Sequence, residues 1–175
     1  MSDEVKDAGA IDTLPELLAH ALAMETEATE RYGELADQME THRKTKVAAI
    51  FRRLEKEERV HLVELTHMCS QHDLPHYAPW DFKWSTGESP EAIDIGKVSY
   101  QLSVRDAVKL ALEHERRAAD FYGGIAQNTT DTEVSILASQ FAAEEREHIG
   151  WLENFLAEAG PDDTAEDPDP PLSQE

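Results

Sequence analysis

The sequence predicts an all-α fold: an antiparallel four-helix bundle with one long crossover between the second and third helices. Three observations lead to this fold class. Apolar residues recur every three or four positions along four separate stretches, which is the period of a helix with one buried face. Prolines and glycines gather between residues 72 and 102, where no periodic pattern continues. Short connections join the first helix to the second and the third to the fourth, which favours two antiparallel pairs.

The first helix is expected over about residues 13–40. Thr13 is a suitable N-cap and Pro15 fits the first turn. The residues of this helix that are expected to face the core form its inward stripe. They are apolar or aromatic except for one carboxylate, Glu25. The stripe comprises Leu18, Leu22, Glu25, Ala28, Tyr32, Leu35 and Met39.

The second helix is expected over about residues 45–71. Its stripe is apolar except at Glu58 and His61, which lie three positions apart. The stripe comprises Val47, Ile50, Leu54, Glu58, His61, Leu65 and Met68. The segment 72–102 is interpreted as a long connection, and its aromatic-rich string HYAPWDFKW is expected to pack over the bundle.

The third helix is expected to begin at Ser103, an N-cap candidate, and the fourth to cover about residues 131–158. Polar residues again interrupt the two inward stripes, at Glu115 in the third helix and at Glu145 and His148 in the fourth. The stripes comprise Val108, Leu112, Glu115, Ala119, Tyr122 and Ala126, then Val134, Leu137, Phe141, Glu145, His148, Leu152 and Phe155.

The chain is expected to form one folded unit, the bundle over residues 13–159. Residues 1–12 are an N-terminal extension. Residues 160–175 are acidic, rich in proline and poor in large apolar side chains, so this tail is predicted to be disordered.

Composition excludes several classes of partner. The net charge is −21, so the surface should repel nucleic acids and anionic lipids. No apolar run approaches the roughly 20 residues that a membrane span needs, and the N-terminus does not resemble a secretory leader. The single cysteine, Cys69, cannot form an intrachain disulfide and is interpreted as a small apolar filler. We expect a cytoplasmic protein without a membrane or nucleic-acid partner.

A short motif occurs twice, as EERVH at residues 57–61 and as EEREH at residues 144–148. In each copy a glutamate precedes a histidine by three positions, which places both on one face of a helix, where they can bind the same metal ion or neighbouring ions. A third pair with this spacing, Glu64 and His67, lies roughly 120° around the helix from the inward stripe. That pair is expected to face outward.

The other two helices also resemble each other. Alignment of METEATERY with HERRAADFY places Glu25 over Glu115 and Tyr32 over Tyr122. The four predicted helices thus bring four glutamates and two histidines inward. Buried carboxylates are costly unless they are paired or bind a cation, and two divalent cations would balance four glutamates.

This pattern resembles the rubrerythrin-like branch of the ferritin-like di-iron carboxylate superfamily, over about residues 14–158. The resemblance implies that Glu58 and Glu145 bridge two metal ions. The remaining implied ligands are Glu25 and His61 for one ion and Glu115 and His148 for the other. Two iron ions are the implied cofactors, with manganese or zinc as alternatives, because carboxylates with imidazole suit iron and manganese and no thiolate is present.

The chain departs from this family in three respects. It has no pair of CxxC motifs for a rubredoxin-type iron site, so a peroxidase activity would need an external electron donor. The family's extra glutamate on the third helix is replaced by Leu112 or Ala118, which leaves a symmetric site closer to the ferroxidase centre of bacterioferritin. Arg59 stands where bacterioferritin has its haem-binding methionine, so we expect no haem.

Two classes of function fit these residues. The first is an oxidoreductase that oxidises Fe(II) with hydrogen peroxide or oxygen, in peroxide defence or iron handling. The second is a non-catalytic metal-binding or iron-delivery module. Oxygenase or desaturase chemistry ranks lower, since no substrate pocket is identified. Tyr32 and Tyr122 are interpreted as core residues with a bonded hydroxyl beside the metal site. We expect a homodimer.

Overall fold

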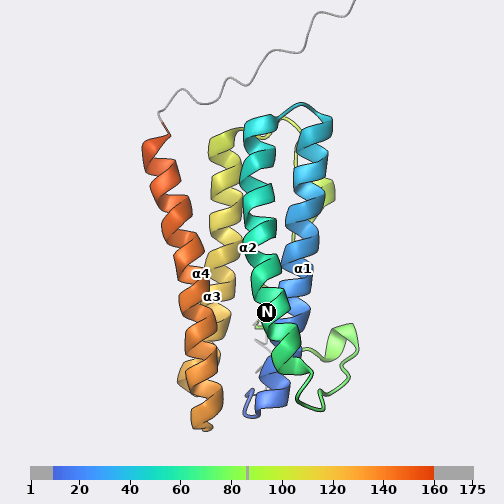
Figure 1. Cartoon of the computed structure of the whole chain (residues 1–175), viewed down its shortest axis with the longest axis vertical. Helices are drawn as coiled ribbons and strands as arrows, with labels where there is room; N and C mark the ends of the chain where they lie inside the picture. The colour runs from blue at the N-terminus through green and yellow to red at the C-terminus, as the bar shows by residue number, and fades with distance from the viewer. Residues whose placement is uncertain (1–9, 86, 160–175) are drawn as a thin grey trace, which may run out of the picture.

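The computed structural model of the protein describes residues 10–85 and 87–159, so the predicted tail lies outside the described residues. The four helices are α1 (Leu14–Thr41), α2 (Thr45–Cys69), α3 (Val104–Asn128) and α4 (Thr132–Glu158), with two short 3-10 helices, η1 (Pro79–Asp81) and η2 (Ile95–Lys97), in the connection after α2. In Figure 1, α1 and α4 run in one direction and α2 and α3 in the other. The predicted antiparallel bundle with a long crossover is confirmed.

Side-chain caps begin three of the helices. The hydroxyl of Thr13 accepts the Glu16 N–H at 3.4 Å, and that of Ser103 accepts the Asp106 N–H at 3.1 Å. Asp131 accepts two backbone N–H groups at the start of α4. Each cap satisfies donors that would lack a partner within the helix. α2 ends at Cys69, two residues before the expected position.

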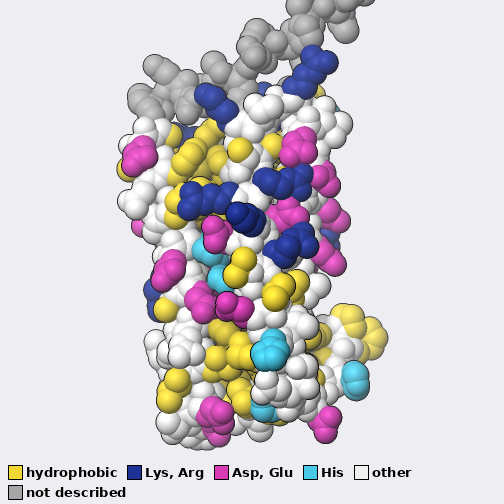
Figure 2. Space-filling view, in the orientation of Figure 1, with side chains coloured by type: hydrophobic (Ala, Val, Ile, Leu, Met, Phe, Trp, Pro, Cys, Tyr) yellow, Lys and Arg dark blue, Asp and Glu magenta, His cyan; other side chains and the backbone are white. Residues whose placement is uncertain are grey.

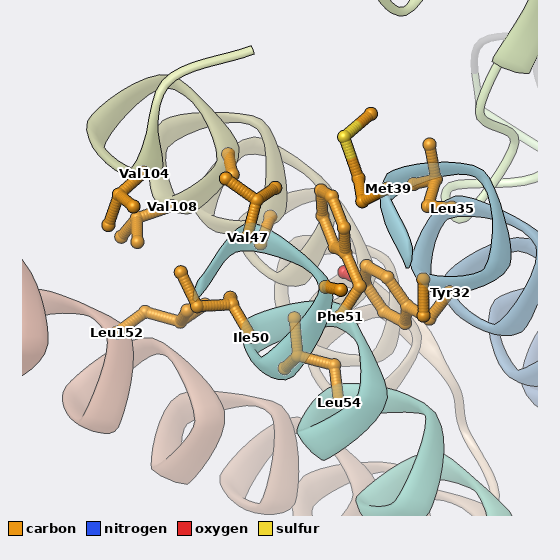
Figure 3. Packing of buried hydrophobic residues seen from close by; sticks show 14 of the residues in the cluster. Tyr32, Leu35, Met39, Val47, Ile50, Phe51, Leu54, Val104, Val108 and Leu152 are labelled. Carbon is orange, nitrogen blue, oxygen red and sulfur yellow. The ribbon is translucent and has the colours of Figure 1, made fainter. Parts of the chain in front are cut away.

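Two hydrophobic clusters fill the bundle, one toward each end. The first contains Tyr32 and draws on all four helices, as Figure 3 shows. The second contains Tyr122 together with Leu17 and Met24 of α1 and Phe141 of α4. Most residues of the predicted inward stripes are buried; the partly exposed members are Leu22, His61, Met68, Ala126, Leu137 and Phe155.

The crossover packs against α1 and α3, as expected for its aromatic string. The ring of His20 lies 5.1–5.2 Å from the rings of three aromatic residues of the crossover, Tyr77, Phe82 and Trp84. The backbone N–H of Lys83 also donates to Nε2 of His20 at 2.9 Å. The crossover is therefore held in a fixed position over the bundle.

Charged side chains of both signs spread over the face of the molecule seen in Figure 2, with histidines near its middle. Within the described residues, none of the helices combines the length and apolarity that a membrane span requires.

Candidate metal centre

The structure brings all six predicted ligand residues together in the middle of the bundle. Their donor atoms form two groups, and within each group every donor atom lies within 4.8 Å of the others. The first group comprises Glu25, Glu58, His61 and Glu145, and the second comprises Glu58, Glu115, Glu145 and His148. Glu58 and Glu145 belong to both groups, so their carboxylates stand between the two positions that a metal ion could take.

Five of the six residues are buried. Glu115 is fully enclosed, and Glu25, Glu58 and Glu145 are at most 5% exposed. His61 is the exception, with 19% of its side chain exposed. The centre is therefore shielded from bulk water except on the side of His61.

The two tyrosines donate hydrogen bonds across the centre in a symmetric pattern. The hydroxyl of Tyr32 on α1 donates to Glu115 on α3 at 2.5 Å. The hydroxyl of Tyr122 on α3 donates to Glu25 on α1 at 3.0 Å. Each tyrosine therefore fixes the glutamate of the opposite helix, and the repeat seen in the sequence becomes a structural repeat.

The two histidines lie parallel, with ring centroids 5.0 Å apart and planes 8° from parallel. Nδ1 of His148 lies 3.0 Å from a carboxylate oxygen of Glu115 and 3.0 Å from one of Glu58. Nδ1 of His61 lies 3.7 Å from an oxygen of Glu58. Both imidazoles thus direct Nδ1 toward the shared carboxylates.

The pKa values in the centre are strongly perturbed. Burial, followed by the neighbouring carboxylates, raises the pKa of Glu25 and of Glu145 well above the ordinary value. Burial also acts to raise the pKa of Glu58, but the interactions with His148 and His61 outweigh it and lower this pKa to about 2. Burial lowers the pKa of His148, but its hydrogen bonds to Glu115, Glu145 and Glu58 outweigh burial and raise it. Crowded carboxylates of this kind favour the binding of a cation.

Two buried atoms of the centre lack a well-formed hydrogen bond. Nδ1 of His61 lies 3.7 Å from an oxygen of Glu58, and Oε1 of Glu58 shares Nδ1 of His148 with Glu115. Buried polar atoms are normally satisfied, and such exceptions require an explanation. A bound metal ion would accept a lone pair from each of these two atoms. The donor set of four carboxylates and two imidazoles fits two divalent ions in number, in charge and in chemical type.

The third glutamate–histidine pair provides a comparison within the same helix. Glu64 and His67 are both exposed, as the helical phase predicts. Cys69 is buried and packs in the second hydrophobic cluster, away from the two groups of donor atoms. Glutamate–histidine spacing alone therefore does not distinguish the centre from the surface, whereas the position on the inward stripe does.

Sequence reasoning missed two buried residues, Glu91 of the crossover and His114 of α3. Glu91 lies in a segment with no periodicity, so nothing indicated its direction. A signal did exist on α3, which carries a second apolar stripe next to the predicted one. That stripe comprises Ala107, Ala111, His114, Ala118 and Phe121, all buried. Its presence indicates that another segment covers this face of the helix.

Comparisons with known proteins agree with this geometry. The sequence model of the rubrerythrin family matches residues 16–135. One solved structure, of an uncharacterised conserved protein from Magnetospirillum magnetotacticum MS-1, is 36% identical in sequence with a TM-score of 0.69. The match covers 85% of this chain and 96% of that one. None of the curated proteins matches the chain.

The family match covers most of the chain and includes Glu25, Glu58, His61 and Glu115. The matched region ends before Glu145 and His148, which the structure nevertheless brings into the same buried cluster. The chain belongs to the rubrerythrin family and has the ferritin-like four-helix bundle with a buried carboxylate and histidine cluster suited to two metal ions.

Proposed function

We propose that the protein is a non-haem di-iron oxidoreductase that oxidises Fe(II) with hydrogen peroxide or oxygen. The observation that carries this proposal is the sharing of Glu58 and Glu145 between the two groups of donor atoms. Two ions bound by these groups would have two carboxylates in common, which suits a pair of ions that react together with one oxidant.

Each remaining ligand belongs to one group. Glu25 and His61 would complete the coordination of one ion, and Glu115 and His148 that of the other. Two bound ferrous ions would supply one electron each, which with two protons reduces one hydrogen peroxide to two water molecules. The protein contributes positioned donors and a water-poor enclosure.

The surrounding residues keep this arrangement in place. Tyr32 and Tyr122 hold Glu115 and Glu25 in fixed orientations through their hydrogen bonds. Hydrophobic clusters above and below the centre exclude water along the bundle axis. The partly exposed ring of His61 marks the side by which a small oxidant would enter.

Iron is the proposed metal, with manganese or zinc as alternatives, because all donors are carboxylate oxygens or imidazole nitrogens. Turnover as a peroxidase would require an external electron donor. The only cysteine of the chain, Cys69, cannot build a second iron site of the rubredoxin type.

Metal analysis and stopped-flow mixing test the proposal. The purified protein should bind about two iron ions per chain, and its diferrous form should consume oxidant faster than free Fe(II) does. A faster reaction with peroxide would indicate a peroxidase, and a faster reaction with oxygen would indicate a ferroxidase. Metal binding without any rate above that of free Fe(II) would instead support the non-catalytic metal-binding module.

Substitution of the shared carboxylates tests the site. Glu58→Ala and Glu145→Ala should each reduce the oxidation rate to that of free Fe(II), because each removes a donor from both groups. Glu64→Ala is the matched control, since Glu64 lies on the same helix as Glu58, also precedes a histidine by three positions, and is exposed. Circular dichroism checks that each variant folds. Fast oxidation in both test variants would contradict the proposed site.

A further inference from the structure

A fifth glutamate is buried beside the candidate metal centre. Glu91 lies in the crossover, yet only 3% of its surface is exposed. Its Oε2 atom is buried and has no hydrogen-bond partner. A carboxyl group in this condition is costly unless a cation or a proton compensates it.

Contacts of the crossover with α3 place Glu91 at the height of the centre. The ring of Trp84 lies 5.2 Å from that of Phe121. The carbonyl of Pro90 accepts a hydrogen bond from the ring of His114. The crossover therefore passes along α3 in the opposite direction. Glu91, the residue after Pro90, lies near the height of His114, whose neighbour on α3 is Glu115.

Glu91 also lies within electrostatic range of the centre. Its carboxyl interacts electrostatically with each of the four glutamates that the two groups contain, Glu25, Glu58, Glu115 and Glu145. The hydroxyls of Tyr32 and Tyr122 also experience its charge. Glu91 belongs to neither of the two groups of donor atoms, so its buried carboxyl lies at the edge of the centre.

The segment around Glu91 is fixed. The N–H of Ala92 donates to the carbonyl of Ser89 at 3.0 Å, which forms a turn. Ile93 is buried in the first hydrophobic cluster together with Val104 and Ala107 of α3. The backbone of Glu91 is thus held by this turn and by the burial of Ile93, which keeps its carboxyl in the buried position.

The charge count accommodates this fifth carboxylate. Two divalent ions and the guanidinium of Arg117 carry five positive charges, against five glutamates. Burial, followed by the neighbouring carboxylates, raises the pKa of Glu91, whereas Arg117 acts in the opposite direction. Arg117 itself is held by a 2.7 Å hydrogen bond to Nδ1 of His114.

The geometry points to Glu91 as an additional metal ligand of the centre, supplied by the crossover instead of by a helix. Leu112 and Ala118, the two positions on α3 considered for the family's extra glutamate, are buried and apolar. The crossover would therefore supply the extra carboxylate that α3 lacks. This assignment rests on the proposed metal-binding site.

Titration with Co(II) tests the assignment in the full chain by optical absorption and by competition with a chromophoric chelator. The wild-type protein should bind two Co(II) ions per chain. Glu91→Gln should weaken the binding of at least one ion by roughly tenfold or more, a loss of the size seen when groups that support a metal site are removed. It should also intensify the visible absorption per ion, because Co(II) absorbs more strongly when it has fewer ligands.

Glu88→Gln is the matched control, since Glu88 lies three residues earlier in the same crossover and is exposed. It should leave both readouts unchanged. A crystal structure of the wild-type protein with Mn(II) gives a test that needs no variant: a Glu91 oxygen should lie within about 2.0–2.6 Å of an ion.

Two outcomes would overturn the assignment, and they are distinguishable. If the wild type binds two ions but Glu91→Gln has the same affinity and spectrum, or the crystal structure shows Glu91 away from both ions, Glu91 is a structural carboxylic acid and the six-ligand centre stands. If the wild type binds no pair of ions, the proposed metal centre itself fails and the role of Glu91 fails with it.

Discussion

At the scale of single residues, two carboxylates of the centre, Glu25 and Glu115, are held by hydroxyl donors from the opposite helix. Tyr32 and Tyr122 are fully buried, and burial raises the pKa of each phenol well above its ordinary value, as do Glu115 for Tyr32 and Glu25 for Tyr122. Both hydroxyls therefore remain protonated and act as donors. This arrangement fits their interpretation as core residues with a bonded hydroxyl.

Replacement of either tyrosine by phenylalanine should destabilise the protein. Tyr32→Phe and Tyr122→Phe leave a buried carboxyl oxygen without its donor, which costs about 1–3 kcal/mol. Urea denaturation in the presence of a chelator measures the change in the free energy of unfolding. Tyr100→Phe is the control, because Tyr100 is about half exposed and should change little. Equal stability of all three variants would show that the two hydrogen bonds are energetically unimportant.

At the scale of elements, the crossover is an integral part of the bundle. His20 on α1 and His114 on α3 are both buried, and each hydrogen-bonds the crossover backbone. Burial is the largest cause that lowers the pKa of both rings, and that of His114 falls to about 4. Neutral rings can accept a hydrogen bond on one nitrogen and donate from the other, which both positions require.

Removal of the His20 ring should loosen the crossover. In His20→Ala, the N–H of Lys83 loses its acceptor, and three aromatic rings lose a packing partner. The amide of Lys83 should exchange its hydrogen at least about fivefold faster, since a hydrogen bond contributes about 1 kcal/mol. Hydrogen exchange read by NMR measures this rate. His20→Gln, which retains an acceptor, should recover part of the protection, and unchanged exchange in His20→Ala would contradict the anchoring role.

At the scale of the whole molecule, the buried centre links stability to protons and to metal ions. The pKa is raised in the folded state for most of its groups, namely Glu25, Glu91, Glu115, Glu145, His61 and His148. Groups with a raised pKa bind more protons when folded than when unfolded, so they contribute stability that is lost as the pH rises. A metal ion competes for the same lone pairs, so it should reverse this dependence.

The metal-free protein should therefore become more stable as the pH falls from 8 to about 6.5. Below about pH 6.5, His20 and His114 act in the opposite direction. Their pKa values are lowered in the folded state, so these histidines take up protons more readily in the unfolded chain, which favours unfolding. Urea midpoints in a chelator at the two pH values measure this effect. With Mn(II) in excess, the midpoint should instead fall over the same range. Stability that rises with pH in the metal-free protein would contradict the buried carboxylate cluster.

Several expectations for the whole molecule remain predictions. These are the homodimer, the cytoplasmic location and the external electron donor. The boundaries proposed for the N-terminal extension and the tail also remain predictions.

The sequence by itself determined the four helices, their inward stripes and the six residues that meet in the centre. This was achievable because a helix has a fixed period, so spacing alone decides which side chains share a face. The repeat of Glu25 with Tyr32 and of Glu115 with Tyr122 also lies in the sequence. The outward direction of Glu64 and His67 follows from the same helical phase.

Only the tertiary structure decided how the crossover lies on the bundle and that Glu91 is buried beside the centre. Irregular segments have no period, and their direction depends on contacts with residues far away in the chain. For Glu91, those contacts are the Pro90 carbonyl with His114 and the burial of Ile93 against α3. The pairing of each tyrosine hydroxyl with the glutamate of the opposite helix likewise required the packed helices, because it depends on distances across the bundle that helical phase alone does not determine.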